Sequence, residues 1–221
     1  RIKWACGPAW SRSHEFLSSV SGMISADGRL FYFFDEGLTG TTDAPIPERW
    51  KLIARDAFNG KLLWKRPVPQ WGTRGWKSKA LRATNRLAPH RFVAGDGKLF
   101  VTLGFAAPVS MLDAATGKTL RTWKGTEDTQ ELRYLDGVLL LRNGGRLTAL
   151  DVQSGDKLWE TAGRIRPQVI AAGGGRVVYQ DGLELCCRGL QNGKQLWQRT
   201  EKVAAKQVLV HEDCLIVGGA T

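Results

Sequence analysis

Arg146–Trp159 reads RLTALDVQSGDKLW, and three other stretches of the chain repeat this pattern. They are Lys51–Trp64 (KLIARDAFNGKLLW), Ser110–Trp123 (SMLDAATGKTLRTW) and Glu184–Trp197 (ELCCRGLQNGKQLW). Each stretch consists of an apolar run, a turn that ends in glycine, and a short run that ends in tryptophan. The turn glycines Gly60, Gly117, Gly155 and Gly193 lie 57, 38 and 38 residues apart. The chain is therefore built from repeats of about 38 residues, the first two separated by insertions.

A second turn lies upstream in each repeat, at Gly28, Gly97, Gly137 and Gly175. Asp-Gly and Gly-Gly pairs between β-forming residues are strong signals for a two-residue hairpin turn, because these residues tolerate positive φ. The third repeat then reads as four strands, at Glu131–Leu135, Val138–Leu141, Arg146–Leu150 and Lys157–Thr161. Four antiparallel strands in about 40 residues are typical of one blade of a β-propeller.

The predicted fold class is therefore all-β, a β-propeller of four-stranded antiparallel blades. Four complete blades are expected at about 23–66, 91–124, 130–162 and 168–200, with partial blades at 1–5 and 206–218. An open arc of blades leaves apolar faces uncovered, so we expect the 221 residues to be part of a longer chain with seven or eight blades. The alternative is that residues 1–5 complete the last partial blade and close a five-bladed ring.

Turn and tryptophan positions have structural roles in this prediction. Asp56, Asp113 and Asp151 are expected to accept backbone N–H groups in turns that end at Gly60, Gly117, Gly155 and Gly193. Trp64, Trp159 and Trp197 follow the turn glycine by four residues and Trp123 by six, which keeps all four on one face of the fourth strand. Their large apolar surface predicts that they pack between neighbouring blades.

These repeats resemble the quinoprotein-dehydrogenase-like (PQQ-like) β-propeller repeat, most closely at Arg146–Trp159, at Pro108–Leu120 and at Leu52–Trp64. The resemblance covers nearly the whole chain from Met23 onward and implies one of two functions. Quinoprotein alcohol dehydrogenases bind pyrroloquinoline quinone and calcium at the ring axis. Non-catalytic propellers of the outer-membrane assembly lipoprotein type bind proteins and hold no cofactor. The same resemblance implies a periplasmic or other extracytoplasmic location, although the first residues show no signal-peptide pattern.

Adjacent cysteines invite comparison with the disulfide that lies over the quinone in some methanol-type dehydrogenases. Cys186 and Cys187 align with Thr148 and Ala149 inside a predicted third strand, so we expect one thiol on each face of that strand rather than a disulfide in a loop. No motif supports a calcium-binding pair or a catalytic aspartate. The sequence therefore assigns no catalytic, cofactor-binding or metal-binding residue, and no cofactor is expected outside the quinoprotein alternative.

The chain is basic, with 32 Lys+Arg against 21 Asp+Glu. From Ala57 to Gly95 there are nine Lys and Arg residues and no acid, with Trp71 and Trp76 among them. Basic residues between aromatic ones suit contacts with a polyanion. The candidate anion contacts are Arg74, Lys77, Lys79, Arg82 and Arg86. A solvated loop is the simpler interpretation of such a run, so a nucleic-acid partner is not expected.

No apolar run approaches the roughly 18 residues that a membrane-spanning helix needs. The leading hypothesis is a non-catalytic propeller that acts as a protein-interaction scaffold within a larger chain. The alternatives are a PQQ- and calcium-dependent dehydrogenase, and a polyanion-binding protein that uses residues 57–95.

Overall fold

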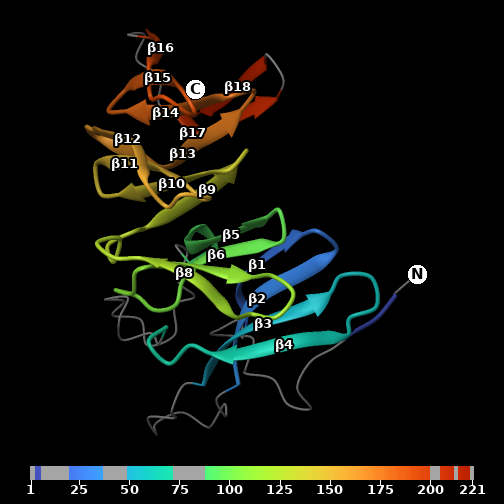
Figure 1. Cartoon of the computed structure of the whole chain (residues 1–221). Helices are drawn as coiled ribbons and strands as arrows, with labels where there is room; N and C mark the ends of the chain where they lie inside the picture. Colours follow the sequence, from blue (N-terminus) through green and yellow to red (C-terminus); the bar gives the residue numbers. More distant parts are fainter. Residues whose placement is uncertain are drawn as a thin grey trace, which may run out of the picture. The chain divides into compact units, whose positions relative to one another are not determined.

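The computed structural model describes residues 3–5, 20–36, 49–71, 88–199, 205–211 and 214–219. Their regular secondary structure is β-strand apart from one short 3-10 helix, η2 (Ala88–Arg91). They form two compact units, Arg1–Glu127 and Asp128–Thr221, which are considered separately. Figure 1 shows the antiparallel sheets of each unit.

The first unit contains two four-stranded antiparallel sheets, each with its strands in chain order. The first sheet consists of β1 (Val20–Ala26), β2 (Arg29–Asp35), β3 (Trp50–Asp56) and β4 (Leu62–Pro67). The second consists of β5 (Phe92–Gly95), β6 (Lys98–Thr102), β7 (Val109–Asp113) and β8 (Thr119–Trp123).

The second unit contains two more four-stranded sheets and a two-stranded one. The third sheet consists of β9 (Glu131–Leu135), β10 (Val138–Asn143), β11 (Arg146–Asp151) and β12 (Lys157–Ala162). The fourth consists of β13 (Ile165–Gly173), β14 (Arg176–Asp181), β15 (Glu184–Gly189) and β16 (Gln195–Arg199). Strands β17 (Ala205–His211) and β18 (Cys214–Gly219) form a hairpin. This repeated meander is the predicted blade, and the all-β propeller class is confirmed.

The fourth sheet begins earlier than the repeat pattern indicates. Strand β13 pairs with β14 through Ile165 and again from Ile170, and the register shifts between these two residues. Gln168, inside the shift, has φ of 65°. A bulge of this kind adds unpaired residues to one strand, so the β-pattern is interrupted where the sequence suggests the strand should start.

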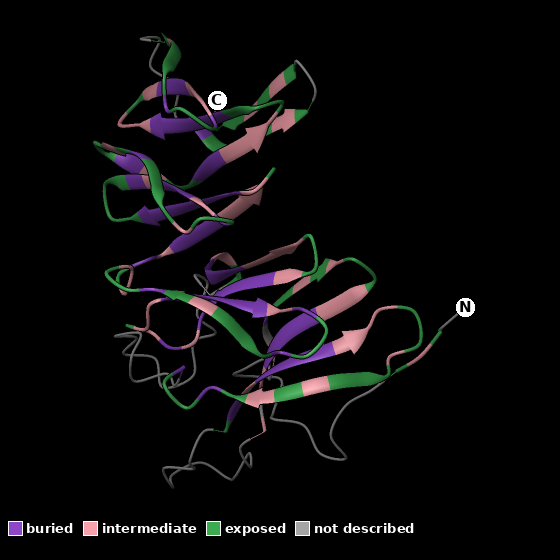
Figure 2. Cartoon of the chain, viewed as in Figure 1, coloured by how far each residue is buried: buried purple, intermediate pink, exposed green. Residues whose placement is uncertain are grey.

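Burial follows the position of a strand in its sheet. Second and third strands are buried on both faces, as in the pattern BBBBB along Val138–Arg142, whereas the fourth strands are mostly exposed (Figure 2). In the first unit one apolar cluster combines Phe31 and Leu52 of the first sheet with Leu99 and Leu112 of the second. Adjacent sheets within a unit therefore share a core through side chains on their facing surfaces.

A tryptophan on a fourth strand packs against the turn glycine of the following sheet. The Trp64 indole N–H donates to the Ala114 carbonyl at 3.0 Å, and a Cβ added to Gly117 would lie 2.7 Å from Trp64 Cδ2. In the second unit, Trp159 donates to Leu190 at 2.7 Å and covers Gly193 in the same way. We call this the indole–glycine contact.

Residues 3–5 are not in a strand, yet Trp4 makes the same contact with the first sheet. Its indole N–H donates to the Ala57 carbonyl at 3.2 Å, and a Cβ on Gly60 would lie 2.5 Å from Trp4 Cδ2. The Trp123 ring lies 6.4 Å from the ring of Phe100 in its own sheet, measured between centroids. Trp197 is half-buried on β16.

Gly117→Ala tests the indole–glycine contact, and Gly97→Ala is the matched control. The two glycines have φ of 71° and 68°, but no atom lies within 4 Å of a Cβ placed on Gly97. Gly97→Ala should cost about 1–2 kcal/mol of left-handed backbone strain. Gly117→Ala should cost about 1–3 kcal/mol more, because the methyl group clashes with Trp64. Urea unfolding measures both, and equal losses would contradict the contact.

Candidate functional site

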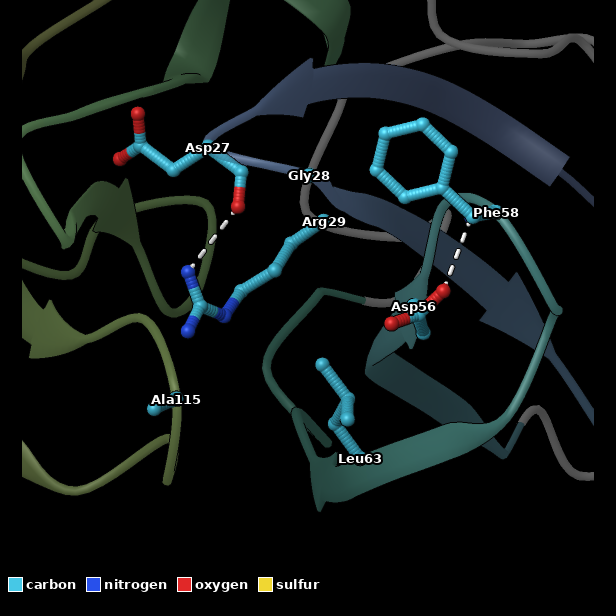
Figure 3. Close-up of a pocket in the computed structure, with 7 residues that line it drawn as sticks. All are labelled: Asp27, Gly28, Arg29, Asp56, Phe58, Leu63 and Ala115. Carbon is cyan, nitrogen blue, oxygen red and sulfur yellow. Dashed lines mark hydrogen bonds between the residues drawn. The ribbon is translucent and has the colours of Figure 1, made fainter.

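A shallow pocket of about 300 Å³ lies where the turns of the first sheet meet a turn of the second (Figure 3). We call it the Phe58 pocket. Its lining residues come from the β1–β2 hairpin, the β3–β4 turn, strand β4 and the β7–β8 turn: Asp27, Gly28, Arg29, Asp56, Phe58, Leu63 and Ala115. All seven belong to the first unit.

Hydrogen bonds within the turns fix the shape of the pocket. The Asp56 carboxylate accepts the backbone N–H groups of Phe58 and Asn59, both at 2.9 Å. The N–H of Ala57 donates to the Gly28 carbonyl at 2.9 Å, which ties the β3–β4 turn to the β1–β2 hairpin. Asp27, at φ 50°, accepts the N–H of Gly97 on its carboxylate at 2.8 Å. The wall of the pocket is therefore held by backbone-directed bonds from both sheets.

The side chains of Phe58 and Arg29 project from these turns into the lining of the pocket. Phe58 is 78% exposed, and its ring lies beside Gly28, where an added Cβ would be 3.3 Å from the ring. Arg29 donates to the Asp27 carbonyl at 3.2 Å and runs toward Asp27 in Figure 3, and its charge helps to lower the pKa of Asp113. Leu63, on β4, is 38% exposed. An aromatic ring, an aliphatic side chain and a guanidinium group thus face one open depression.

The turn aspartates predicted from the repeats lie in separate sheets. The Asp113 carboxylate accepts the Thr116 hydroxyl and the N–H of Thr116, both at 2.7 Å. These Thr116 bonds hold the pKa of Asp113 below its usual range. The Asp151 carboxylate accepts the N–H of Ser154 at 2.7 Å. The fourth repeat has Gly189 at this position, and Asn192 still accepts the N–H of Lys194 at 3.0 Å, as Asn59 accepts that of Lys61 in the first.

Arg55 and Arg188 show a partnership that the sequence analysis missed. Arg55 donates to the Tyr32 hydroxyl at 2.9 Å and to the Gly60 carbonyl at 2.7 Å. Arg188 makes the equivalent bonds to Tyr179 and Gly193, at 2.9 and 2.8 Å. The second and third repeats have leucines at this position, Leu112 and Leu150. The sequence contains a signal for this pair, because only the two repeats with the arginine have a tyrosine on the second strand, Tyr32 and Tyr179.

The polyanion hypothesis depended on the stretch from Ala57 to Gly95. Its candidate contacts lie outside the described residues: Arg74, Lys77, Lys79, Arg82 and Arg86. Trp76 also lies outside the described residues, whereas Trp71 is described. Trp71 is 1% exposed and stacks on Phe33 with ring centroids 3.9 Å apart, so it fills the core instead of standing among the basic residues.

Positive charge is concentrated in the first unit. Residues 1–127 contain 20 of the 32 Lys+Arg and 10 of the 21 Asp+Glu, a net charge of +10, which leaves +1 for residues 128–221. The Phe58 pocket thus lies in a basic unit, although its own lining contains two aspartates and one arginine.

A buried ion cluster joins the third and fourth sheets. Glu131 is 1% exposed, and its carboxylate lies 2.7 Å from Arg133 and 3.3 Å from Arg142. It also accepts the N–H of Gln168, at 2.9 Å, in the β13 bulge. Burial lowers the pKa of Arg142, and the Glu131 charge opposes that change. One buried carboxylate thus links strands β9, β10 and β13.

Cys186 and Cys187 lie on β15 as free thiols. Adjacent strand residues point to opposite faces, but both side chains are buried because both faces of β15 are covered. Burial raises the pKa of each thiol, so both are protonated and poorly reactive. The lid disulfide of methanol-type dehydrogenases has no counterpart in these two residues.

The described residues contain no group of three or more His, Cys, Asp or Glu side chains placed to share a metal ion. No helix among them has the length and apolarity needed to cross a bilayer.

Comparison with known proteins adds a family and a set of solved structures. The family model described as outer membrane protein assembly factor BamB matches residues 68–208. A comparison with curated protein sequences gives no significant match. BamB from Moraxella catarrhalis is similar in structure, with a TM-score of 0.57 and 12% identity over 90% of this chain and 54% of that one.

Two further solved structures with a similar fold are proteins of other kinds. Kluyveromyces lactis Hsv2p aligns with a TM-score of 0.54 and 10% identity, over 90% of this chain and 57% of its own. A europium-containing methanol dehydrogenase aligns with a TM-score of 0.50 and 14% identity, over 88% and 44%. At these identities the likeness shows the fold alone. The chain spans about half the length of each of these proteins.

The Thr116–Asp113 bonds predict a pH-dependent loss in Asp113→Asn. Because the folded pKa of Asp113 is lowered, its ionised carboxylate stabilises the fold at pH 7, and that contribution is lost as the pH falls through the folded pKa. Asp113→Asn should therefore destabilise the protein at pH 7 and progressively less toward pH 3. Urea unfolding at several pH values measures this, and a loss independent of pH would contradict it.

Glu131→Gln tests the ion cluster against Glu160→Gln. The first change leaves the buried Arg142 without its counter-charge and should cost about 3 kcal/mol. Glu160 pairs with Arg146 and Lys157 at 3.6 and 3.8 Å on the surface, so its loss should cost about 0.5 kcal/mol or less. Both residues lie in the second unit, and chemical denaturation compares them directly. Similar losses of unfolding free energy in the two variants would show that the Glu131 cluster contributes no more than a surface ion pair.

Proposed function

The chain belongs to the family described as outer membrane protein assembly factor BamB, and on this premise we propose that it is a non-catalytic β-propeller scaffold that binds other proteins. The proposal places it in an extracytoplasmic compartment, as the family description implies. It assigns no catalytic residue and no resident cofactor to the described part of the chain.

The observation that carries the proposal is the exposure of Phe58. The repeats provide an internal comparison, because the same turn position holds Ala115, Gln153 and Gln191 in the other three sheets. A small or polar residue is therefore sufficient for the turn. A phenylalanine that is 78% exposed adds apolar surface that the fold does not bury. Exposed aromatic residues in a depression are typical of protein-binding sites.

The dehydrogenase alternative has less support in the described residues. A methanol dehydrogenase shares the fold, but fold does not determine function. Cys186 and Cys187 are free thiols, unlike the disulfide over the quinone in some methanol-type dehydrogenases. The scaffold proposal needs no such disulfide.

Phe58→Ala should separate binding from stability. We expect the free energy of unfolding to change by about 0.5 kcal/mol or less, because the ring is mostly exposed. Co-purification of partner proteins from envelope extracts of the native host should fall several-fold. Gln191→Ala, at the same position of the fourth sheet, should leave co-purification unchanged. Quantitative mass spectrometry of the purified complexes measures both.

Two results would count against the proposal. If no protein co-purifies with the wild-type chain in its natural full-length form, the scaffold role fails. If the full-length protein binds pyrroloquinoline quinone stoichiometrically in the presence of calcium and supports dye-linked alcohol oxidation, the non-catalytic role fails. Absorbance of the bound quinone and reduction of the dye are the measurements.

A further inference from the structure

We propose that the edge strands β4 and β8 of the first unit bind the surface of an anionic phospholipid bilayer. Leucines at bulges in these strands enter the interfacial region of the bilayer, and the basic side chains around them contact the lipid phosphates. We call this surface the basic edge, and its residues are Lys61, Leu63, Lys65, Arg66, Lys118, Leu120, Arg121 and Lys124. The inference goes beyond the proposed protein-binding function and does not depend on it.

A bulge occurs at the same repeat position in all four fourth strands. In the pairing of β3 with β4 the register shifts between Ala54 and Arg55, which leaves Leu63 without a partner residue. The equivalent shifts in the other three sheets leave a leucine unpaired each time: Leu120, Leu158 and Leu196. A bulge on an edge strand hinders the pairing of a further strand. The basic edge is therefore a poor template for a partner that adds a β-strand.

The bulged leucines leave much of their apolar surface in solvent. The exposed fractions are 38% for Leu63, 54% for Leu120, 36% for Leu158 and 48% for Leu196. Both β4 and β8 are edge strands, and Figure 2 shows them mostly as exposed and half-buried segments. A bilayer surface can take up exposed apolar side chains without a groove of matching shape.

The two strands of the basic edge lie side by side. The Arg66 guanidinium on β4 donates to the Gly117 carbonyl at 3.1 Å and to the Thr119 hydroxyl at 2.8 Å, and Thr119 is the first residue of β8. Leu63 and Ala115, of the β7–β8 turn, line the same depression. The leucines and basic residues of the two strands therefore belong to one continuous surface.

Charge distinguishes these two strands from their counterparts in the second unit. Residues 56–67 and 113–124, each comprising a turn and the fourth strand after it, contain six basic and two acidic residues. The equivalent residues 151–162 and 189–200 contain three of each. The net charge is thus +4 in the first unit and zero in the second, although both units have the bulged leucines.

Acidic groups near the basic edge do not cancel its charge. Asp27 lines the depression beside Leu63, but Arg29 lines it as well. Glu36 pairs with Lys65, and with these three neighbours included the net charge is still +3. Three exposed lysines form no ion pair with another residue that the structure describes: Lys61, Lys118 and Lys124. Several such lysines beside exposed leucines are typical of a protein that lies on an anionic membrane surface.

The leucines separate a bilayer from a soluble polyanion. A nucleic acid or an acidic protein segment is attracted by the basic side chains, and its phosphates or carboxylates gain nothing from a leucine. An anionic bilayer uses both, because its phosphates attract the charges while its acyl chains accept the leucines. Variants that remove the two features one at a time therefore identify the partner.

Vesicles of equal parts phosphatidylglycerol and phosphatidylcholine are the probe, and vesicles of phosphatidylcholine alone are the matched control. Co-sedimentation of the purified whole chain with the vesicles measures the affinity. The chain should bind the anionic vesicles at least tenfold more tightly than the neutral ones. Raising the salt concentration should weaken this binding, because the contacts with the phosphates are ionic.

One pair of variants tests the leucines. Leu120→Ser should weaken binding to the anionic vesicles at least fivefold, because the apolar surface that enters the bilayer is lost. Leu158→Ser changes the equivalent bulge of the third sheet, where acidic residues outnumber basic ones, and should leave binding unchanged. Thermal unfolding followed by circular dichroism checks that both variants are folded.

A second pair tests the charges. Lys118→Gln combined with Lys124→Gln should weaken binding at least tenfold, because two cations near the phosphates are removed. Lys157→Gln combined with Lys194→Gln removes the same charge from the second unit and should change the affinity less than twofold.

Three outcomes would overturn the inference. Equal binding to neutral and anionic vesicles would contradict the role of the charges. Unchanged binding by Leu120→Ser, with the Lys118 and Lys124 variant impaired, would assign the surface to a soluble acidic partner. Equal losses in the two lysine double variants would show attraction by net charge alone. The protein-binding proposal is tested separately, since it depends on co-purification of natural partners and on Phe58.

Discussion

The contact between a fourth-strand tryptophan and the turn glycine of the following sheet is the constraint on which the rest of each unit depends. Trp64 and Gly117 show its three components. The glycine must have positive φ to close the turn, it must lack a side chain to admit the indole, and the carbonyl beside the turn must accept the indole N–H. One tryptophan–glycine pair thus fixes the shape of the turn and the approach of the next sheet, and it places the indole N–H beside a carbonyl that accepts it.

The second sheet carries the tryptophan of its fourth strand at a shifted position. This strand has Arg121 at the position of Trp64 and Trp159, and Trp123 comes two residues later. A shift of two residues retains the face of the strand, because side chains alternate between the two faces. The Trp123 ring lies 6.4 Å from Phe100 and 5.8 Å from the Arg121 guanidinium, so residues of its own sheet surround it as well.

The strands could be predicted because their signals are local, while the candidate site and the ion cluster could not. Asp-Gly turns and alternating residues identify a strand within a few positions. Glu131, by contrast, reads as a polar residue at a strand start, and its partners Arg142 and Gln168 lie 11 and 37 residues away. Phe58 reads as a turn residue, since nothing local indicates its exposure. Comparison of the same position in four repeats was the signal that could have found it.

A repeat protein separates the residues that maintain its fold from those free to acquire a function. In the turn that ends at Gly60, Asp56 holds the backbone and Gly60 leaves room for the Trp4 ring. The Phe58 side chain, between these two residues, is exposed. That position holds phenylalanine, alanine and glutamine in the first three repeats, which all keep the turn aspartate and the turn glycine. A phenylalanine there has little effect on the fold, because its ring stays mostly exposed. The same reasoning applies to any repeat position whose neighbours are supplied by backbone atoms.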